Sequence, residues 1–269
     1  ALKRANIGIA MGLRGTEVAK EAADVVLADD NFATIVRAVE GGRTIYANIA
    51  KFVQMMFSDN LGEVLMIFTA IAAGWALPLL PLQILWMNLV TDVFPALALA
   101  VEPASPEIMK QHPRDAQKTL LSTKLLILIA WQAAMIATLA LTAYLLALKT
   151  YGPGAHSRTI ALFALIGAQL GHMFNCRSRV RSAFDGLFRN PFIWIATAIV
   201  ISLQLVAAYF SPLARILGTV RPSETDWVVV ILCSVAPVLI VEASKAVTRG
   251  RTGTTNKPAM GFGQKVREV

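Results

Sequence analysis

The fold of this chain follows from two apolar stretches, FSDNLGEVLMIF at residues 57–68 and ILWMNLVTDVF at residues 84–94. Each stretch carries a few polar residues among large hydrophobic ones. Residues three or four apart share one face of a helix, so the polar residues of each stretch converge on one side if both are helical. Ionisable side chains at membrane depth are costly and usually line a pathway. We therefore expect two facing membrane helices with a cation site that contains Asn60, Glu63, Asn88, Thr91 and Asp92.

The composition predicts several membrane spans. Hydrophobic residues make up 56% of the 269 residues, and the mean hydropathy is +0.58, more than a soluble domain needs for its core. Residues 125–148 and 190–214 carry no charge, and about 20 residues suffice to cross the hydrocarbon layer as a helix. The fold class is mainly α, a polytopic bundle of six spans. We place them at about 49–74, 80–101, 125–148, 158–176, 191–211 and 226–244.

The net charge of +8 is distributed as in a membrane protein. If the N-terminal segment is cytoplasmic, fourteen Lys and Arg residues fall in later cytoplasmic segments and four on the other side. The positive-inside rule favours this orientation, with the C-terminal tail cytoplasmic as well. Basic residues are not interleaved with aromatic ones, which argues against nucleic acid as a partner. The short loops and compact tail suggest an integral, multi-pass protein of a bacterial plasma membrane.

Cysteine and histidine do not predict a metal or disulfide framework. Cys176 and Cys233 form no CxxC pair, and the three histidines are scattered along the chain. The first residues, ALKRANIGIAMG, include neither an initiator Met nor a signal peptide. We therefore expect the chain to begin inside a domain. Near the last span, Glu242 is expected to be a structural partner of Lys245.

Residues 1–48 read as the end of an α/β domain. We predict a strand at Ile7–Met11, a helix at 16–24 and a strand at Val25–Ala28. A long helix should start near Phe32, capped within Asp29–Asn31, and continue into the first span. So short a segment cannot close a core alone, so it needs further chain or a partner. Residues 247–269 are expected to be a disordered cytoplasmic tail.

Five motifs together resemble the C-terminal third of the type II cation-transporting P-type ATPases, which include the calcium pumps. They occur in the family's order. They are IGIAMG (7–12), GTEVAKEAADVVLADDNFATIV (15–36), GRTIYANIAKF (42–52), SDNLGE (58–63) and LWMNLVTDVFPALALAVEP (85–103). The resemblance implies that residues 1–48 are the C-terminal remnant of a haloacid-dehalogenase-like phosphorylation domain with its stalk helix. It also implies that residues 49–246 form the six-helix cation-transport domain.

The family's catalytic motifs do not occur in this chain. The phosphorylated Asp of DKTGT is absent, and the Mg²⁺-binding GDGxND loop would lie just upstream of Ala1. The resemblance therefore places the ATP and Mg²⁺ sites outside this chain. It also implies as partners the actuator, nucleotide-binding and phosphorylation domains and the first four spans. By itself the chain should not hydrolyse ATP, so whether it counts as an enzyme stays open.

The resemblance also implies a ligand set for the transported cation. Asn60 and Glu63 match ligands of the family's fifth span, and Asn88, Thr91 and Asp92 match those of its sixth. Gln169 stands where reticulum-type calcium pumps place a Glu on the eighth span and plasma-membrane-type pumps a Gln. The transported cation is expected to be Ca²⁺, which takes six to eight oxygen ligands. Glu63 and Asp92 balance one divalent ion, which favours one Ca²⁺ per cycle, with proton counter-transport through Glu63 as an open alternative.

Two residues near the candidate site call for separate expectations. Pro95 removes one backbone hydrogen bond near Asp92, and the freed carbonyl could hold an ion. Asp59 departs from the family, in which a small residue stands at this position. It lies about 100° around the helix from Asn60, which favours contact with a neighbouring span instead of the ion.

Several alternatives stay open. The polar residues could be hydrogen-bonding contacts between helices, and the chain could be a non-catalytic, truncated or split-gene remnant of a pump. A secondary carrier or channel is a third reading, but carriers show internal repeats, which this sequence lacks. Oxygen ligands alone would also admit Na⁺, K⁺ or Mn²⁺.

Overall fold

The computed structural model describes residues 1–113, 120–178 and 182–252. The chain forms two compact units. The first contains Ala1–Ala50 and the segment that begins at Pro103, and the second contains Lys51–Glu102 and the chain from residue 120 onward. The boundary falls inside one long helix, α2 (Phe32–Ala72), which belongs to both units.

The first unit contains a small parallel β-α-β arrangement, as predicted. It follows a short 3-10 turn, η1 (Leu2–Arg4), and consists of β1 (Ile9–Met11), α1 (Glu17–Ala22) and β2 (Val25–Leu27). Ile9 lies opposite Val25 in the parallel ladder. The strand begins two residues later than predicted, because Gly8 pairs with Asp24 in the turn before β2. Thr16 caps α1 by accepting a hydrogen bond from the Ala19 N–H at 3.3 Å.

The entry into α2 is built by three polar residues. The Asp30 carboxylate accepts hydrogen bonds from the N–H groups of Leu13 and Arg14, both at 2.9 Å. Asn31 accepts from the Ala33 N–H at 2.9 Å and thereby caps the helix. A hydrogen bond from the Thr34 hydroxyl lowers the pKa of the Asp29 carboxyl below its ordinary value. The predicted cap within residues 29–31 is confirmed.

A second contact within the first unit joins α2 to the segment after residue 102. That segment contains the 3-10 turn η2 (Ile108–Lys110). The Arg43 guanidinium donates to the backbone carbonyls of Ile108 at 3.0 Å and Gln111 at 2.9 Å. Arg43 thereby ties two parts of the chain 65 residues apart.

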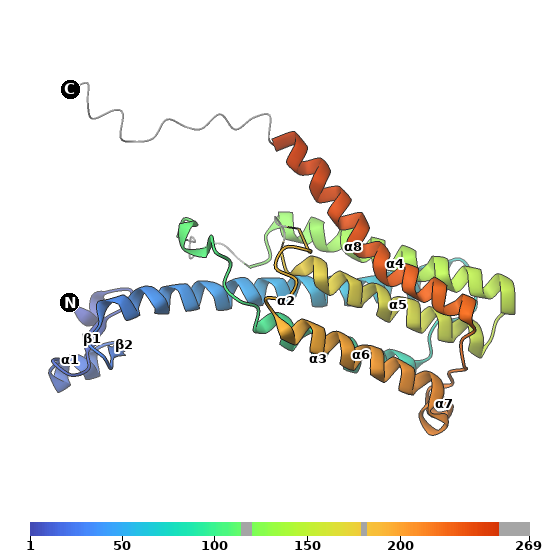
Figure 1. The fold of residues 1–269 in the computed structure, drawn as a ribbon, viewed down its shortest axis with the longest axis horizontal. Helices are drawn as coiled ribbons and strands as arrows, with labels where there is room; N and C mark the ends of the chain where they lie inside the picture. Colours follow the sequence, from blue (N-terminus) through green and yellow to red (C-terminus); the bar gives the residue numbers. More distant parts are fainter. Residues whose placement is uncertain (114–119, 179–181, 253–269) are drawn as a thin grey trace. The chain divides into compact units, whose positions relative to one another are not determined.

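Six helices of the described chain are long and apolar enough to cross a membrane (Figure 1). These are α2, α3 (Pro81–Ala100), α4 (Thr123–Tyr151), α5 (Ala155–Cys176), α6 (Pro191–Tyr209) and α8 (Glu224–Thr252). A short helix, α7 (Ser211–Leu217), lies between α6 and α8. Each predicted span coincides with one of these helices, so the predicted fold class is confirmed. α8 extends through Thr252, past the predicted end of the last span, and the rest of the predicted tail, residues 253–269, lies outside the described residues.

α5 is the central helix of the second unit. It packs against α3, α4 and α8. In its most apolar stretch, 94% of the residues are buried inside the protein. Figure 1 shows α5 with α4 and α8 on one side and α3 on the other. Gly167 and Gly171 allow the close approach of α8, because an added Cβ at either position would overlap Ser234. Small residues spaced by four are typical of tight helix contacts in membranes.

Buried ionic contacts fix one end of this unit. The Arg177 guanidinium pairs with the Glu102 carboxylate at 3.0 Å, joining the end of α5 to the residues after α3. Asn190, the cap of α6, donates to the other oxygen of Glu102 at 2.6 Å. Within α8, the Glu242 carboxylate pairs with the Lys245 ammonium group at 3.0 Å. This ion pair confirms the expected structural role of Glu242.

Candidate cation site

Polar residues of α2 and α3 interact electrostatically. Asn60 and Glu63 lie on α2, and Asp92 lies on α3. Asn60 and Glu63 both lie close enough to Asp92 to interact electrostatically with its carboxylate. Glu63 is only 6% exposed. The structure thus brings together one amide and two carboxylates from facing helices.

Two members of the predicted set use their donor groups within their own helices. The Asn60 Nδ2 donates to the Met56 carbonyl at 2.9 Å, and the Thr91 hydroxyl donates to the Met87 carbonyl at 3.0 Å. Hydrogen bonds of this kind to the residue four positions earlier use the hydroxyl proton of Thr91 and one of the two amide protons of Asn60. The Asn60 amide oxygen and the lone pairs of the Thr91 hydroxyl therefore remain acceptors that a cation could use.

The remaining α3 residues follow the same face. Asn88 is half-buried and lies four residues before Asp92, so both share one side of the helix. Pro95 is buried inside α3, which continues to Ala100. Since proline has no N–H, the carbonyl of Thr91, four residues earlier, lacks its helical donor. This carbonyl adds a backbone oxygen next to Asp92.

Gln169 comes from α5 and is 3% exposed. Its Oε1 has no hydrogen-bond partner among the described residues. α5 packs against α3, but no contact in the described part of the chain joins Gln169 to the polar residues of α2 or α3. Gln169 thus contributes a buried acceptor without a donor, and its membership of the site stays a prediction.

Asp59 is buried on α2 beside a neighbouring span. Its carboxylate is 2% exposed and interacts electrostatically with Asp92 of α3. The electrostatic partner of Asp59 thus comes from a neighbouring span, and whether Asp59 contacts the ion stays a prediction. The spacing to Asn60 suggested a different face, whereas the spacing of four residues to Glu63 places Asp59 and Glu63 side by side.

A polar contact between α2 and α4 was not predicted. Gln132 of α4 accepts a hydrogen bond from the Gln54 amide at 3.0 Å and from the Ser58 hydroxyl at 3.4 Å. One turn further along α2, Gly62 lies against α4, where an added Cβ would come within 3.2 Å of the Ala133 carbonyl. The signal in the sequence was Gln132 itself, a lone amide within a charge-free stretch. These contacts hold α2 in place beside the site.

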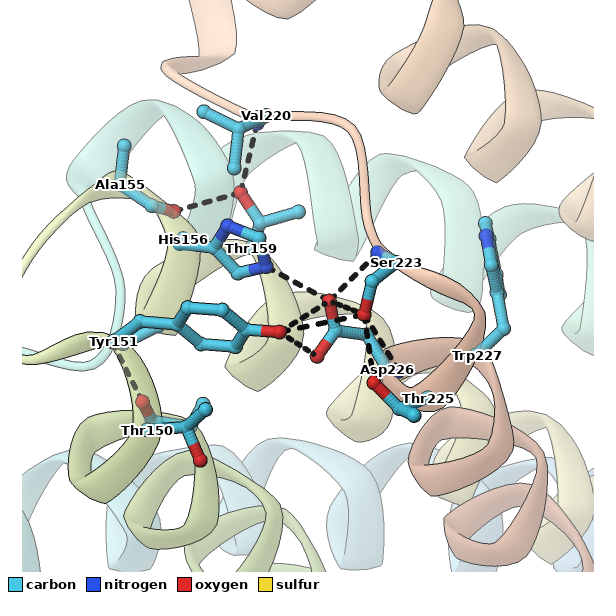
Figure 2. Close-up of polar contacts among 12 residues, drawn as sticks. Thr150, Tyr151, Ala155, His156, Thr159, Val220, Ser223, Thr225, Asp226 and Trp227 are labelled. Atoms are coloured by element: carbon cyan, nitrogen blue, oxygen red, sulfur yellow. Dashed lines mark hydrogen bonds and ion pairs between the residues drawn. The ribbon is translucent and has the colours of Figure 1, made fainter.

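A second polar cluster, at Tyr151, His156, Ser223 and Asp226, differs from the candidate site because its groups are partnered (Figure 2). The Asp226 carboxylate lies 2.8 Å from the His156 Nε2 and accepts from the Ser223 N–H at 2.7 Å. The Tyr151 hydroxyl donates to the same carboxylate at 3.2 Å, and its ring stacks on that of His156. We call these four residues the clasp, because they join the α4–α5 connection to the start of α8.

Acidic, histidine and cysteine side chains alone do not complete a metal site in the described part of the chain: no three of them lie close enough to hold an ion. A cation between α2 and α3 would need amide, hydroxyl and backbone oxygens beside the carboxylates. Cations such as Ca²⁺ accept such mixed sets of oxygen ligands.

Comparisons with known proteins agree with this arrangement. The family described as "Cation transporting ATPase, C-terminus" matches residues 76–247. Calcium-transporting ATPase 1 of Bacillus cereus is 41% identical over 262 residues, covering 91% of this chain and 29% of that protein. The calcium-transporting ATPase of Bacillus subtilis is 39% identical over 245 residues, covering 91% and 28%. The endoplasmic reticulum-type calcium-transporting ATPase 2 of Arabidopsis thaliana is 34% identical over 310 residues, covering 93% and 29%. The chain spans less than a third of the length of these relatives.

Proposed function

Since this chain belongs to the cation-transporting ATPases and corresponds to their C-terminal part, we propose that it forms the membrane path for the cation of an ATP-driven pump that exports Ca²⁺. The observation that carries this proposal is the meeting of Asn60, Glu63 and Asp92 between α2 and α3. Oxygen ligands with carboxylates among them suit calcium. The three relatives named above are calcium-transporting ATPases, which supports the choice of ion.

The proposed ligands have distinct roles. Glu63 and Asp92 supply formal charge, while Asn60, Asn88 and Thr91 supply neutral oxygens, and Gln169 adds one from α5. Two carboxylates balance one divalent ion, and charge interactions are strong in a low-dielectric interior. We therefore propose one Ca²⁺ per cycle. Asp92 is central because it faces both Asn60 and Glu63.

The first unit would belong to the part of the pump that handles ATP. Its two strands leave Val25 and Val26 exposed, at 40% and 44%, and such apolar surface favours packing against further chain. We propose that this unit completes a cytoplasmic phosphorylation domain whose ATP and Mg²⁺ sites lie elsewhere in the pump. The partners of the chain are then the lipid bilayer and the other domains and spans of that pump.

The test is the ion dependence of an intact pump that carries this segment. Asp92→Asn keeps the size of the side chain but removes its charge. We expect it to raise the Ca²⁺ concentration that half-saturates phosphorylation from ATP by about tenfold or more, which corresponds to about 1.4 kcal/mol or more. Asp226→Asn makes the same chemical change in the clasp and should leave this concentration unchanged.

The opposite order of effects would place the ion-binding site elsewhere in the protein. If Asp92→Asn retains the wild-type calcium dependence while Gln169→Ala abolishes it, the ion binds nearer α5 than α3. If the wild-type pump shows no dependence on Ca²⁺ but responds to Na⁺, K⁺ or Mn²⁺, the proposed ion is wrong and the proposed path is kept.

A further inference from the structure

The connection between α5 and α6 holds its backbone polar groups toward the protein. Its described part is residues 182–190. The Ala183 N–H donates to the Glu242 carboxylate of α8 at 2.8 Å. The Arg177 guanidinium, at the end of α5, donates to the Gly186 carbonyl at 2.9 Å. The connection is therefore tied to both α5 and α8.

The other side of this connection carries exposed aromatic rings. Phe184 and Phe188 are 57% and 83% exposed. The Phe188 ring stacks on Trp194 of α6 with 5.6 Å between the ring centroids, and Trp194 meets Phe174 of α5 edge-on at 5.6 Å. The Trp194 N–H donates to the Leu187 carbonyl at 3.0 Å, so this ring cluster needs no hydrogen bond from water. A clustered apolar surface of this kind marks an interaction site.

The length of α6 places this surface at the edge of a bilayer. α6 has 19 residues and is about 28 Å long, close to the thickness of the hydrocarbon core, about 30 Å. Both ends of α6 therefore lie near a boundary of that core. Trp194 is the fourth residue of the helix, and the last residue, Tyr209, accepts a hydrogen bond from the Trp227 N–H at 3.1 Å. Tryptophan and tyrosine are enriched at these two levels of membrane proteins.

Charged neighbours narrow the choice of partner. Asp185 and Arg189 are exposed and stand next to Phe184 and Phe188 in the sequence. Charged groups are costly in the hydrocarbon core, and exposed phenylalanine rings are unfavourable in water. The headgroup region accepts both, because amphipathic segments lie there with their apolar side chains at the boundary with the acyl chains.

We propose that residues 182–190 are a membrane anchor, whose Phe184 and Phe188 rings insert among the phospholipid headgroups of one leaflet. The partner is the headgroup–acyl boundary of a phospholipid bilayer. Because Ala183 and Gly186 tie the same residues to α8 and α5, the anchor sets the depth of these helices in the membrane. None of these residues is among the proposed cation ligands, so the inference goes beyond the cation path and holds for any transported ion.

The experiment measures the depth of a fluorescent label in the intact pump that contains this segment, reconstituted into phosphatidylcholine vesicles. All native cysteines are replaced, and Phe188→Cys carries a bimane label. The quenchers are a nitroxide on the lipid headgroup, a nitroxide at the middle of the acyl chain, and iodide on both sides of the membrane. Ile201→Cys, exposed near the middle of α6, is the hydrocarbon control. Gln111→Cys, exposed in the polar segment after α3, is the aqueous control.

We expect the label at Phe188→Cys to lose more fluorescence to the headgroup nitroxide than to the acyl-chain nitroxide. It should also lose less to iodide than the label at Gln111→Cys does. The label at Ile201→Cys should show the reverse order for the two nitroxides. Phe184→Cys should behave like Phe188→Cys, and it decides the test if labelled Phe188→Cys does not give folded pump.

Three outcomes would overturn the inference. Quenching by iodide as strong as at Gln111→Cys, without quenching by either nitroxide, would leave the rings in water. Protection from all three quenchers would mean that another part of the pump covers the rings. Stronger quenching by the acyl-chain nitroxide than by the headgroup nitroxide would place the connection inside the hydrocarbon core. The transported ion does not enter this measurement, so a failure of the proposed Ca²⁺ site would leave its result unchanged.

Discussion

Buried polar residues of the second unit differ in whether their oxygens have donors. The Asp226 carboxylate of the clasp accepts hydrogen bonds from Tyr151 and Ser223 and contacts His156. By contrast, Asp59 and Gln169 each keep a buried oxygen without a partner among the described residues. An unmet acceptor is costly when it is buried. The clasp is therefore complete as a structural contact, whereas the described residues leave one buried oxygen of Asp59 and of Gln169 without a donor.

Gln169→Ala tests the weaker of the proposed ligands. The side chain brings a neutral oxygen and no charge, so its loss should weaken ion binding less than the loss of a carboxylate does. In an intact pump, we expect Gln169→Ala to raise the half-saturating Ca²⁺ concentration by less than about tenfold, and Glu63→Gln to raise it by about tenfold or more. A larger effect for Gln169→Ala than for Glu63→Gln would contradict this order. Phosphorylation from ATP at graded Ca²⁺ is the measurement.

Helical spacing predicted part of this site and missed the rest. Asn60 and Glu63 are three residues apart, and the structure places both toward Asp92. Asp59 was expected to face a neighbouring span, and its carboxylate interacts electrostatically with Asp92 of α3. Spacing within one helix also cannot show which neighbour a side chain meets, so the contact between Ser58 and Gln132 was not predictable.

At the scale of elements, the packing of α5 against α8 depends on glycine. A Cβ at Gly171 would overlap the backbone carbonyl of Ser234, which cannot move as a flexible side chain would. We expect Gly171→Ala to lower the free energy of unfolding by about 1–3 kcal/mol, the range for overpacked cores. The measurement is the loss of folded pump with temperature or denaturant in detergent.

Gly41→Ala is the matched control for this prediction. Gly41 also lies inside a helix, α2, and an added Cβ there meets nothing within 4 Å. Alanine is the better helix former, so this change should stabilise the protein by about 0.5–1 kcal/mol. Equal effects of the two substitutions would show that α5 and α8 are not in close contact.

The membrane-spanning helices were predictable because each one corresponds to a long run of apolar residues. Each of the six spans is a run of apolar residues that only a helix can carry across a bilayer, and each coincides with a helix of the structure. The short strands were located less precisely: β1 begins at Ile9 and not at Ile7. Boundaries of short elements depend on turn contacts such as the one from Gly8 to Asp24, which the pattern of hydrophobic residues does not contain.

At the scale of the whole molecule, an even number of spans determines the topology. Six spans return the chain to the side from which it started, so the segment before α2 and the C-terminal tail should share one side of the membrane. From the positive-inside rule we predict that this side is cytoplasmic. The α4–α5 connection and the segment between α6 and α8, which meet in the clasp (Figure 2), should then both face the exterior.

Single-cysteine labelling of the intact pump in sealed cells tests this topology. With Cys176 and Cys233 replaced, Lys149→Cys and Arg221→Cys should react with a membrane-impermeant maleimide from outside, because both positions are exposed near the clasp. Arg14→Cys and Lys257→Cys should react only after the cells are opened. Labelling of Lys257→Cys from outside would mean an odd total number of spans, and labelling of Arg14→Cys would reverse the orientation. Either result would place the first unit or the tail on the side opposite to ATP, which the proposed pump does not allow.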